Sequence, residues 1–473
     1  MNCKLISYLR ISALGLAFLI VLTGFLLTED PDQPEGIPTG INPGRVVWAW
    51  NPDATNENCL STADNCDWYW KPENINEEVV ARMFRGALNK LTGDSLITSS
   101  WIKLFIYFNS RKSGINKGYL KGEKIFIKIN QGQSRWLLTQ EEKDKGYYIP
   151  EVLKPSDQSR KLNLIPVETN PYIVLELLRE LVNELGIDQA DIAVGDPFSH
   201  IYGHNYEIWS SEFPDVIYTD KSSSEHGRTV VKPSETDLIH FSDKSYSDRI
   251  YDVVEQADYI INVANLRTHG AALISFTAKG HLGSITSETE RLLHYSHLAK
   301  RKDGAAYEGY KKYRALVDIM GSRYLGQNTM LNIVDALFGG GSDETKGPVK
   351  YFMPPFNNDW CNSLFLSQDQ VAIESVCYDF MRSEWNGVNK HSPINNRWEI
   401  LPDRDGIDDY LHQAADSKNW PEGLIYDPDR SGKPLSSLGV HEHWNDPEKK
   451  QYSRNTGKLS GIELISIPDS LVN

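Results

Sequence analysis

The stretch that decides the fold is Ala257–Gly283, with the sequence ADYIINVANLRTHGAALISFTAKGHLG. Residues 259–264 form an apolar run interrupted only by Asn262, which is typical of a strand buried inside a parallel sheet. A polar segment that contains glycine follows at 265–270. Open α/β sheets bind ligands at the carboxyl ends of such strands, so this stretch predicts both a core strand and a site.

Strands and helices are expected to alternate on both sides of this stretch. Short apolar or alternating runs predict strands at 46–50, 123–129, 190–194, 330–337, 364–366 and 461–465. Helical spacing and capping residues predict helices at 77–91, 101–108, 170–186, 247–256 and 367–385, the last with a capping box of Ser367 and Gln370. This order predicts an α/β fold with a largely parallel sheet and flanking helices, plus a loop-rich C-terminal lobe.

The same pattern divides the chain into five segments. We expect a signal or membrane anchor at 1–27, a linker rich in Pro, Gly and Asp at 28–44, an N-terminal extension packed on the core at 45–122, the α/β core at 123–385, and a loop-rich C-terminal region with a closing strand at 386–473.

The N-terminus predicts export. Lys4 and Arg10 precede the apolar run Ile11–Leu27, and acidic residues follow it within 29–32. This charge asymmetry favours a cytoplasmic N-terminus and a periplasmic or other extracytoplasmic body. Seventeen residues lie between the length of a signal-peptide core and that of a membrane helix, so a cleaved signal and a retained inner-membrane anchor both stay open. No second long apolar run occurs, so we expect the remainder to be soluble.

Charge and cysteine content limit the partners. The formal net charge is −15, and nucleic-acid binders need basic surfaces, so a nucleic-acid partner is not expected. In an oxidising compartment, Cys59 and Cys66 would form a disulfide that stabilises the fold by roughly 2–3 kcal/mol. For Cys377, a bond to Cys361 and a buried free thiol both stay open.

Cationic side chains gather within the deciding stretch. Arg267, His269, Lys279 and His281 stand in a segment otherwise poor in charge. Such a cluster is hard to accommodate unless it lines a polar cleft, where His269 would serve as a base and Lys279 as a cation. The alternative is a histidine bonded to backbone and a lysine on a solvated turn.

Several motifs, in order, resemble the domain-of-unknown-function family 362. The Ala257–Asp258 start of the strand, Thr268-His269 and Lys279 carry the resemblance, which extends over about 123–385. Gly280 departs from the family, which usually has Asn there. The other matching motifs are Lys128-Ile129-Asn130, Thr169-Asn170-Pro171, Asn332–Ala336 and Ser367–Ala372.

The ten-residue spacing from His269 to Lys279 is also similar to the lactate racemase family. That resemblance implies an acid/base role for His269 and a nickel-pincer cofactor held by Lys279. A metal-binding histidine would then be His294 or His297, although Tyr295 stands at the matching offset. A second acid/base would fall near Gly195-Asp196, with His200 beside it.

Other segments could bind metal ions. His200 and His204 are four residues apart and would share a helix face, although Pro197 and Gly203 favour a loop. His441-Glu442-His443 would place two imidazoles on one side of an extended chain. The acidic stretches 403–409 and 427–432 have the carboxylate and glycine rhythm of calcium loops, against the alternative of plain acidic turns.

Taken together, these features favour an exported enzyme that transfers a proton, as racemases and epimerases do, on a small hydroxylated anion. The cleft would contain Lys128, Asn130, Asp196, Arg267, His269 and Lys279, with Lys128 and Arg267 holding the anion. One alternative is a non-catalytic envelope protein that stacks saccharides on Trp68-Tyr69-Trp70. Another is an envelope protein stabilised by calcium. The oligomeric state stays open.

Overall fold

The computed structural model describes residues 33–61, 67–132, 167–221, 227–244, 246–269, 273–286, 309–340, 347–385 and 406–467. The predicted membrane segment, Cys66, His294 and His297 lie outside these ranges. Within them, no helix has both the length and the apolar character that a membrane crossing requires.

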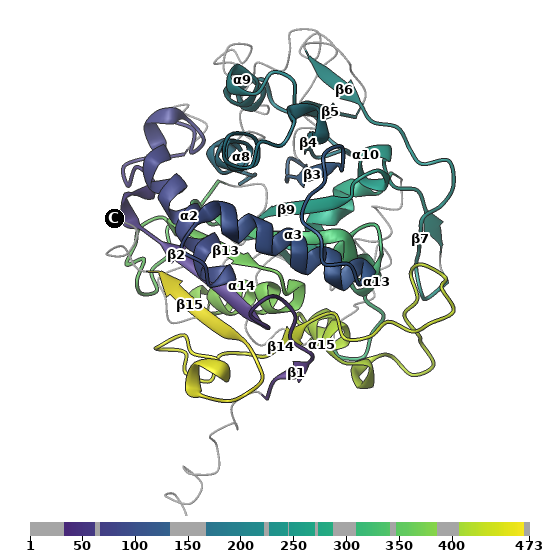
Figure 1. Cartoon of the computed structure of the whole chain (residues 1–473). Coiled ribbons are helices and arrows are strands. Elements are labelled where there is room, and N and C mark those ends of the chain that lie inside the picture. The colour runs from purple at the N-terminus through teal and green to yellow at the C-terminus, as the bar shows by residue number, and fades with distance from the viewer. Residues whose placement is uncertain are drawn as a thin grey trace, which may run out of the picture.

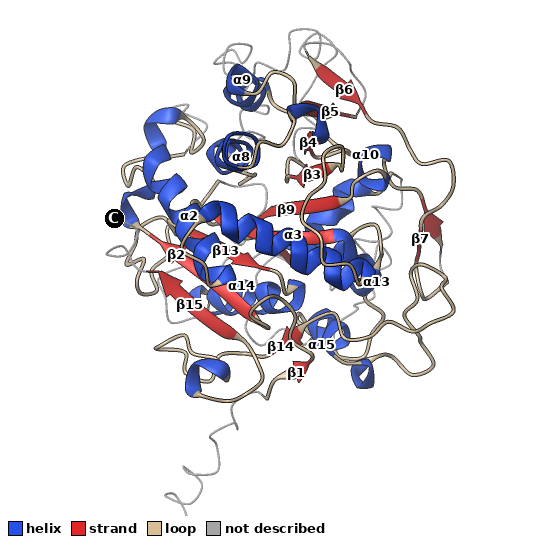
Figure 2. Ribbon diagram, viewed as in Figure 1, coloured by secondary structure: helices blue, strands red, loops and turns tan. Residues whose placement is uncertain are grey.

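A nine-stranded sheet forms the centre of the molecule (Figures 1 and 2), in the order β15-β2-β13-β12-β9-β3-β4-β5-β6. This sheet confirms the predicted α/β class. Its strands are β2 (Arg45–Trp50), β3 (Ile125–Lys128), β4 (Ile192–Gly195), β5 (Ile217–Asp220), β6 (Arg228–Val230), β9 (Tyr259–Asn265), β12 (Thr329–Ala336), β13 (Ser363–Ser367) and β15 (Glu463–Ile467).

Strand direction places a switch point between β3 and β9. The strands β12, β9, β3, β4, β5 and β6 pair in parallel, and β13 runs against both β12 and β2. From β3 the chain moves outward through β4, β5 and β6, and it then returns to add β9 and β12 on the other side of β3. Parallel α/β sheets bind ligands at the carboxyl edge where the strand order reverses in this way.

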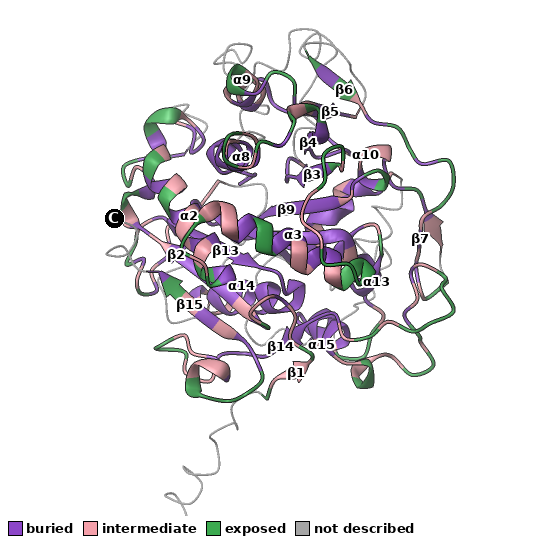
Figure 3. Cartoon of the chain, viewed as in Figure 1, coloured by how far each residue is buried: buried purple, intermediate pink, exposed green. Residues whose placement is uncertain are grey.

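Two apolar layers cover the two faces of the sheet. Side chains along each strand alternate between them, because successive residues of a strand point to opposite faces. In β9, Tyr259 and Ile261 belong to one core and Ile260 to the other, and the central strands are buried throughout (Figure 3). Such a sheet, covered on both faces, needs helices on both sides.

The helices form these two layers. α2 (Glu77–Thr92), α3 (Ile97–Ser113), α8 (Pro171–Leu178, continued by a π-helical turn at Arg179–Glu184) and α9 (Gly203–Glu212) cover one face. The other face carries α10 (Asp252–Glu255), α11 (Thr277–Gly280), α13 (Ala315–Gly321), α14 (Gln370–Glu384) and α15 (Asp409–Ala415).

Two predicted helix starts differ in the structure. α14 is capped by Asp369, whose carboxylate accepts from the backbone N–H groups of Val371 and Ala372, and Ser367 instead ends β13. The predicted helix 247–256 shrinks to α10, because Ser247–Asp248 form β8, which pairs with β7 (Ile239–His240). Tertiary strand pairing overrides the local helical spacing there.

Terminal segments join the core. Glu35–Gly36, inside the predicted linker, forms β1 and pairs antiparallel with β14 (Val440–His441). β2 and β15 come from the segments 45–122 and 386–473, yet both lie in the same sheet as the strands of 123–385. The segment 33–50 and the C-terminal lobe are therefore structurally linked.

Candidate active site

A buried ion pair lies at the carboxyl edge of β3 and β4, on one side of the switch point. Lys128 is the last residue of β3, and its Nζ lies 3.0 Å from Oδ1 of Asp196, which follows β4. The ammonium also donates to the Ile129 carbonyl at 2.6 Å. Burial lowers the pKa of Lys128, and Asp196 opposes that shift. The structure thus brings together two predicted site residues, with the Lys128 charge neutralised by Asp196.

Backbone groups pack tightly around this pair. Asp196 Oδ2 accepts from the Gln131 N–H at 3.0 Å, and the Phe198 N–H donates to the Gly283 carbonyl at 3.0 Å. Gly283 lies so close that a Cβ there would sit 1.9 Å from Asp196 Oδ1 and 3.1 Å from Lys128 Nζ. The stretch Ala257–Gly283 therefore returns to the same edge of the sheet at its last residue. Only a glycine fits there, because any side chain at position 283 would collide with Asp196.

Arg267 and Asn130 meet across the switch point. Arg267 lies two residues beyond the end of β9 and opens the short strand β10 (Arg267–His269), while Asn130 follows β3. The guanidinium donates to the Val167 carbonyl at 2.7 Å and to Asn130 Oδ1 at 3.4 Å, and its Nε has no hydrogen-bond partner within the described ranges. Arg267 is only 5% exposed, and among the described residues its partners are neutral oxygens.

A further buried carboxyl group, that of Asp335, lies at the same carboxyl edge of the sheet, and the sequence analysis did not predict it as a site residue. Asp335, near the end of β12, accepts from the Asn170 N–H at 2.8 Å, the Leu337 N–H at 3.0 Å and Asn265 Nδ2 at 3.2 Å. Burial raises the pKa of Asp335 to about 7 despite these donors. Its signal in the sequence is the segment Asn332–Ala336, which resembles the family but predicts no more than a core strand.

Aromatic residues line the neighbouring interior. The Glu168 N–H donates to the Tyr69 hydroxyl at 2.8 Å, and burial raises the pKa of both Tyr69 and Tyr202. Trp68, Tyr69 and Trp70 are all buried, and Trp70 stacks on His204 with ring centroids 3.6 Å apart. These aromatic residues pack in the interior and do not form the exposed platform that saccharide stacking would require.

His269 and Lys279 lie on adjacent short elements. His269 ends β10, which pairs antiparallel with β11 (Leu273–Ser275), and Lys279 lies on α11 directly afterwards. Both are partly exposed, unlike the buried residues around them. Gly280 packs against β9, where a Cβ would approach Asn262 Oδ1 to 3.2 Å. An asparagine at 280 would therefore require Asn262 to move.

Comparison with known proteins decides the family of this core. Residues 153–379 match the family model described as domain of unknown function (DUF362). Residues 153–379 correspond to the DUF362 domain. No curated protein and no solved structure matches the chain, and the resemblance to lactate racemases is not shown. Among the described elements the match covers α8 to most of α14, whereas Lys128, Asn130 and the C-terminal lobe lie outside it.

Other predicted metal ligands in the DUF362 domain have different partners. The Nδ1 atom of His200 lies 3.0 Å from both carboxylate oxygens of Asp220, in the buried loop before α9. His204 is in the first turn of α9, and burial lowers its pKa to about 3. The two histidines therefore do not share a helix face.

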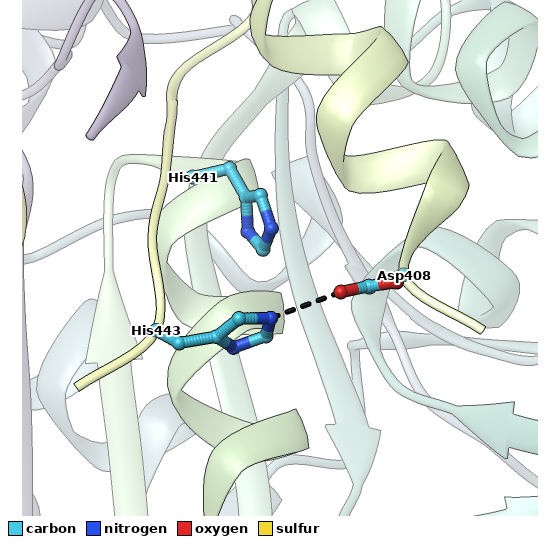
Figure 4. A group of neighbouring side chains, drawn as sticks. All are labelled: Asp408, His441 and His443. Atoms are coloured by element: carbon cyan, nitrogen blue, oxygen red, sulfur yellow. Dashed lines mark hydrogen bonds and ion pairs between the residues drawn. The ribbon is translucent and has the colours of Figure 1, made fainter. Parts of the chain in front are cut away.

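One group of side chains beyond the DUF362 domain has the arrangement of a metal site. Ligand atoms of Asp408, His441 and His443 lie within 4.8 Å of one another, and all three residues are buried (Figure 4). It is the one such group of three or more His, Cys, Asp or Glu within the described ranges. His441 and His443 confirm that the extended chain presents both imidazoles to one side. Burial lowers the pKa of His441, while contacts with Asp379 and Asp408 outweigh burial and raise that of His443 to about 9.

The two predicted calcium loops are arranged differently. Asp408 faces histidines, and Asp409 pairs with Arg314 at 2.7 Å. In the second loop, Asp427 accepts from the N–H groups of Ser431 and Gly432, both at 2.8 Å. The Asp427 oxygens therefore accept hydrogen bonds from the protein itself. Residues 403–405 of the first loop lie outside the described residues.

The described cysteines are free. Cys59, Cys361 and Cys377 are buried thiols. The predicted Cys59–Cys66 disulfide is not seen at Cys59, whose sulfur lies 3.8 Å from the Asp67 carbonyl oxygen. Burial raises the pKa of Cys59 to about 12, so its reactive thiolate form is disfavoured.

Proposed function

We propose that the protein is an enzyme that binds a small hydroxylated anion at the carboxyl edge of its sheet and transfers a proton on it. The observation that carries this proposal is the environment of Arg267. Arg267 is only 5% exposed, and within the described part of the chain its guanidinium donates to neutral oxygens while its Nε has no acceptor.

Electrostatics favours an anion beside Arg267. A buried charge bonded only to neutral oxygens retains much of its desolvation penalty, which is on the order of several kcal/mol, and an anionic ligand would offset that cost. The planar guanidinium suits a carboxylate, which it can bind through two parallel hydrogen bonds. Lys128 is already paired with Asp196, so its role would be to fix the edge, while Arg267 binds the substrate.

Proton transfer is supported by the groups near Arg267. His269 lies two residues further along β10 and is partly exposed, so it can exchange protons with a ligand and with water. In the proposed reaction, His269 removes the proton from the carbon that bears the hydroxyl group, and the electron pair delocalises into the adjacent carboxylate. Lys279 stabilises this developing charge. Return of the proton from His269 restores the substrate, whereas a proton delivered by water to the opposite face of the carbon gives racemisation or epimerisation.

Hydrogen exchange in heavy water tests this reaction across a range of substrates at once. The full chain is incubated with a panel of 2-hydroxy acids and sugar acids in D₂O, and NMR follows loss of the C–H signal at the hydroxyl-bearing carbon. Exchange is expected for at least one member, and it should be lost in Arg267→Met and retained in Arg111→Met, a surface control. Binding without exchange for every member would contradict the enzymatic proposal and favour a ligand-binding protein.

We also propose that the folded body lies outside the cytoplasmic membrane, because basic residues precede the apolar run Ile11–Leu27 and acidic residues follow it. A reporter fused after Asn42 should be active only outside the cytoplasm. Activity inside the cell would contradict export.

A further inference from the structure

We propose that Asp408, His412, His441 and His443 form a zinc-type metal site that fastens the C-terminal lobe to the rest of the fold. Asp408 directly precedes α15 and His412 lies four residues further on, within that helix. His441 and His443 lie two residues apart on the β14 strand and its extension. Figure 4 shows the Asp408, His441 and His443 side chains converging from these two elements.

The outer nitrogen of each histidine is held by a second residue. His412 Nδ1 lies 2.7 Å from Glu35 Oε2, and His443 Nδ1 lies 2.7 Å from Asp379 Oδ1. Histidines that bind metal ions usually donate their other ring N–H to such a group, which fixes the ring and its tautomer. This arrangement turns the Nε2 atoms of both rings inward, to 3.6 Å and 2.9 Å from Asp408 Oδ2.

His441 supplies the most specific observation. Its Nδ1 lies 2.8 Å from Ser375 Oγ, and that hydroxyl donates its own proton to the Val371 carbonyl at 2.8 Å. Ser375 must therefore accept from His441, which places the ring proton on Nδ1 and leaves a lone pair on Nε2. His441 is 1% exposed, and its Nε2 has no hydrogen-bond partner among the described residues. A buried lone pair aimed into a group of ligand atoms is what a metal ion requires.

Ligand type and spacing favour Zn²⁺. Three imidazole nitrogens and one carboxylate oxygen form a common zinc set, whereas Ca²⁺ takes oxygen ligands. A tetrahedral site with bonds of about 2.1 Å separates its ligand atoms by about 3.4 Å. The contacts of 2.9 Å and 3.6 Å around Asp408 Oδ2 are close to that value. The ligand atoms of Asp408, His441 and His443 lie within 4.8 Å of one another, whereas His412 lies outside this group and would have to turn toward the ion.

The site would have a structural role. Its ligands come from α15 and the β14 segment, and the residues that orient them come from β1 (Glu35) and α14 (Ser375 and Asp379). One ion would thus connect the two ends of the described chain to a helix that packs on the central sheet. Four protein ligands leave no open position, as is typical of structural zinc.

Metal content and stability together test the site. The full chain, purified in detergent, is stripped with a chelator and then titrated with Zn²⁺, Ca²⁺ and Co²⁺. We expect one equivalent of Zn²⁺, no comparable Ca²⁺ binding, a tetrahedral Co²⁺ absorption band, and a melting temperature that rises when Zn²⁺ is restored. Binding of much less than one equivalent of Zn²⁺ by the folded chain would overturn the proposal.

Matched variants locate the ion. His441→Ala should abolish the high-affinity equivalent and the zinc-dependent rise in melting temperature, while His240→Ala, outside the group and bonded to Ser247, should change neither. If His441→Ala does not fold, Ser375→Ala is the test variant, because Ser375 orients the His441 ring. Loss of such an orienting partner should weaken Zn²⁺ binding about 10- to 100-fold. Wild-type affinity in whichever of these two variants folds would place the ion elsewhere and overturn the proposal.

Discussion

Gly283 packs directly on Asp196, so that a Cβ at Gly283 would lie 1.9 Å from Asp196 Oδ1. Gly283→Ala should therefore push Asp196 away from Lys128 and cost about 1–3 kcal/mol, the usual range for an overpacked interior. Gly86→Ala is the matched control, because α2 has room there, with Ile467 Cδ1 3.9 Å from the added Cβ. This second change should stabilise the helix by about 0.5–1 kcal/mol. Urea unfolding measures both, and equal effects would contradict the packing argument.

Two buried arginines should respond differently to truncation. Arg314 lies 2.7 Å from Asp409 and both side chains are 1% exposed, so Arg314→Met should cost about 3–5 kcal/mol by leaving a buried charge without its partner. The described partners of Arg267 are neutral oxygens, so Arg267→Met removes a buried charge together with its desolvation cost. It should leave the ligand-free protein as stable as the wild type or more stable, by up to about a few kcal/mol. Chemical denaturation distinguishes them. A loss of several kcal/mol at Arg267 would mean that its charge is already compensated.

The partly exposed pair His269 and Lys279 should matter for activity more than for folding. Alanine at either position is expected to abolish hydrogen exchange on the substrate and, because both side chains are partly exposed, to change the free energy of unfolding by no more than about 1 kcal/mol. His281→Ala is the contrasting variant. Its Nε2 is buried and lies 3.0 Å from Thr329 Oγ1, so its loss should cost about 1–3 kcal/mol. Full exchange activity in His269→Ala would remove that residue from the proposed mechanism.

Asp318 should make stability depend on pH. Burial raises the pKa of this carboxyl to about 7 from its ordinary value of 3.8, although Ser242 and Tyr313 donate to it. The folded protein therefore keeps a proton that the unfolded chain releases. The stabilisation is fully present below about pH 4 and is lost as the pH rises through about 7.

Asp318→Asn removes this titration. Between pH 5 and 8, the free energy of unfolding should fall more steeply with pH for the wild type than for the variant. The difference should reach up to a few kcal/mol across this range, because a shift of one pKa unit corresponds to about 1.4 kcal/mol. Parallel pH profiles for the two proteins would show that the Asp318 carboxyl stays ionised in the fold.

The sequence alone determined most strands of the central sheet, although it did not predict β5 and β6. Strands such as 259–264 and 330–337 were predictable because burial on both faces leaves a continuous apolar run, which is a local signal. It also identified Lys128, Asp196 and Arg267 as residues at one edge, because each follows or ends a core strand and the carboxyl ends of parallel strands meet. Local spacing failed at 247–256, where pairing with β7 converts two residues into strand.

Only the tertiary structure decided which charges find partners. Lys128 with Asp196 and Arg314 with Asp409 are ion pairs between residues far apart in the chain, while Arg267 is left with neutral oxygens among the described residues. The same holds for His441, whose lone pair is fixed by Ser375 from a distant helix. Hydrophobic periodicity is written in neighbouring residues, but hydrogen-bond and charge partners depend on how whole layers pack, and no short window of sequence encodes that packing.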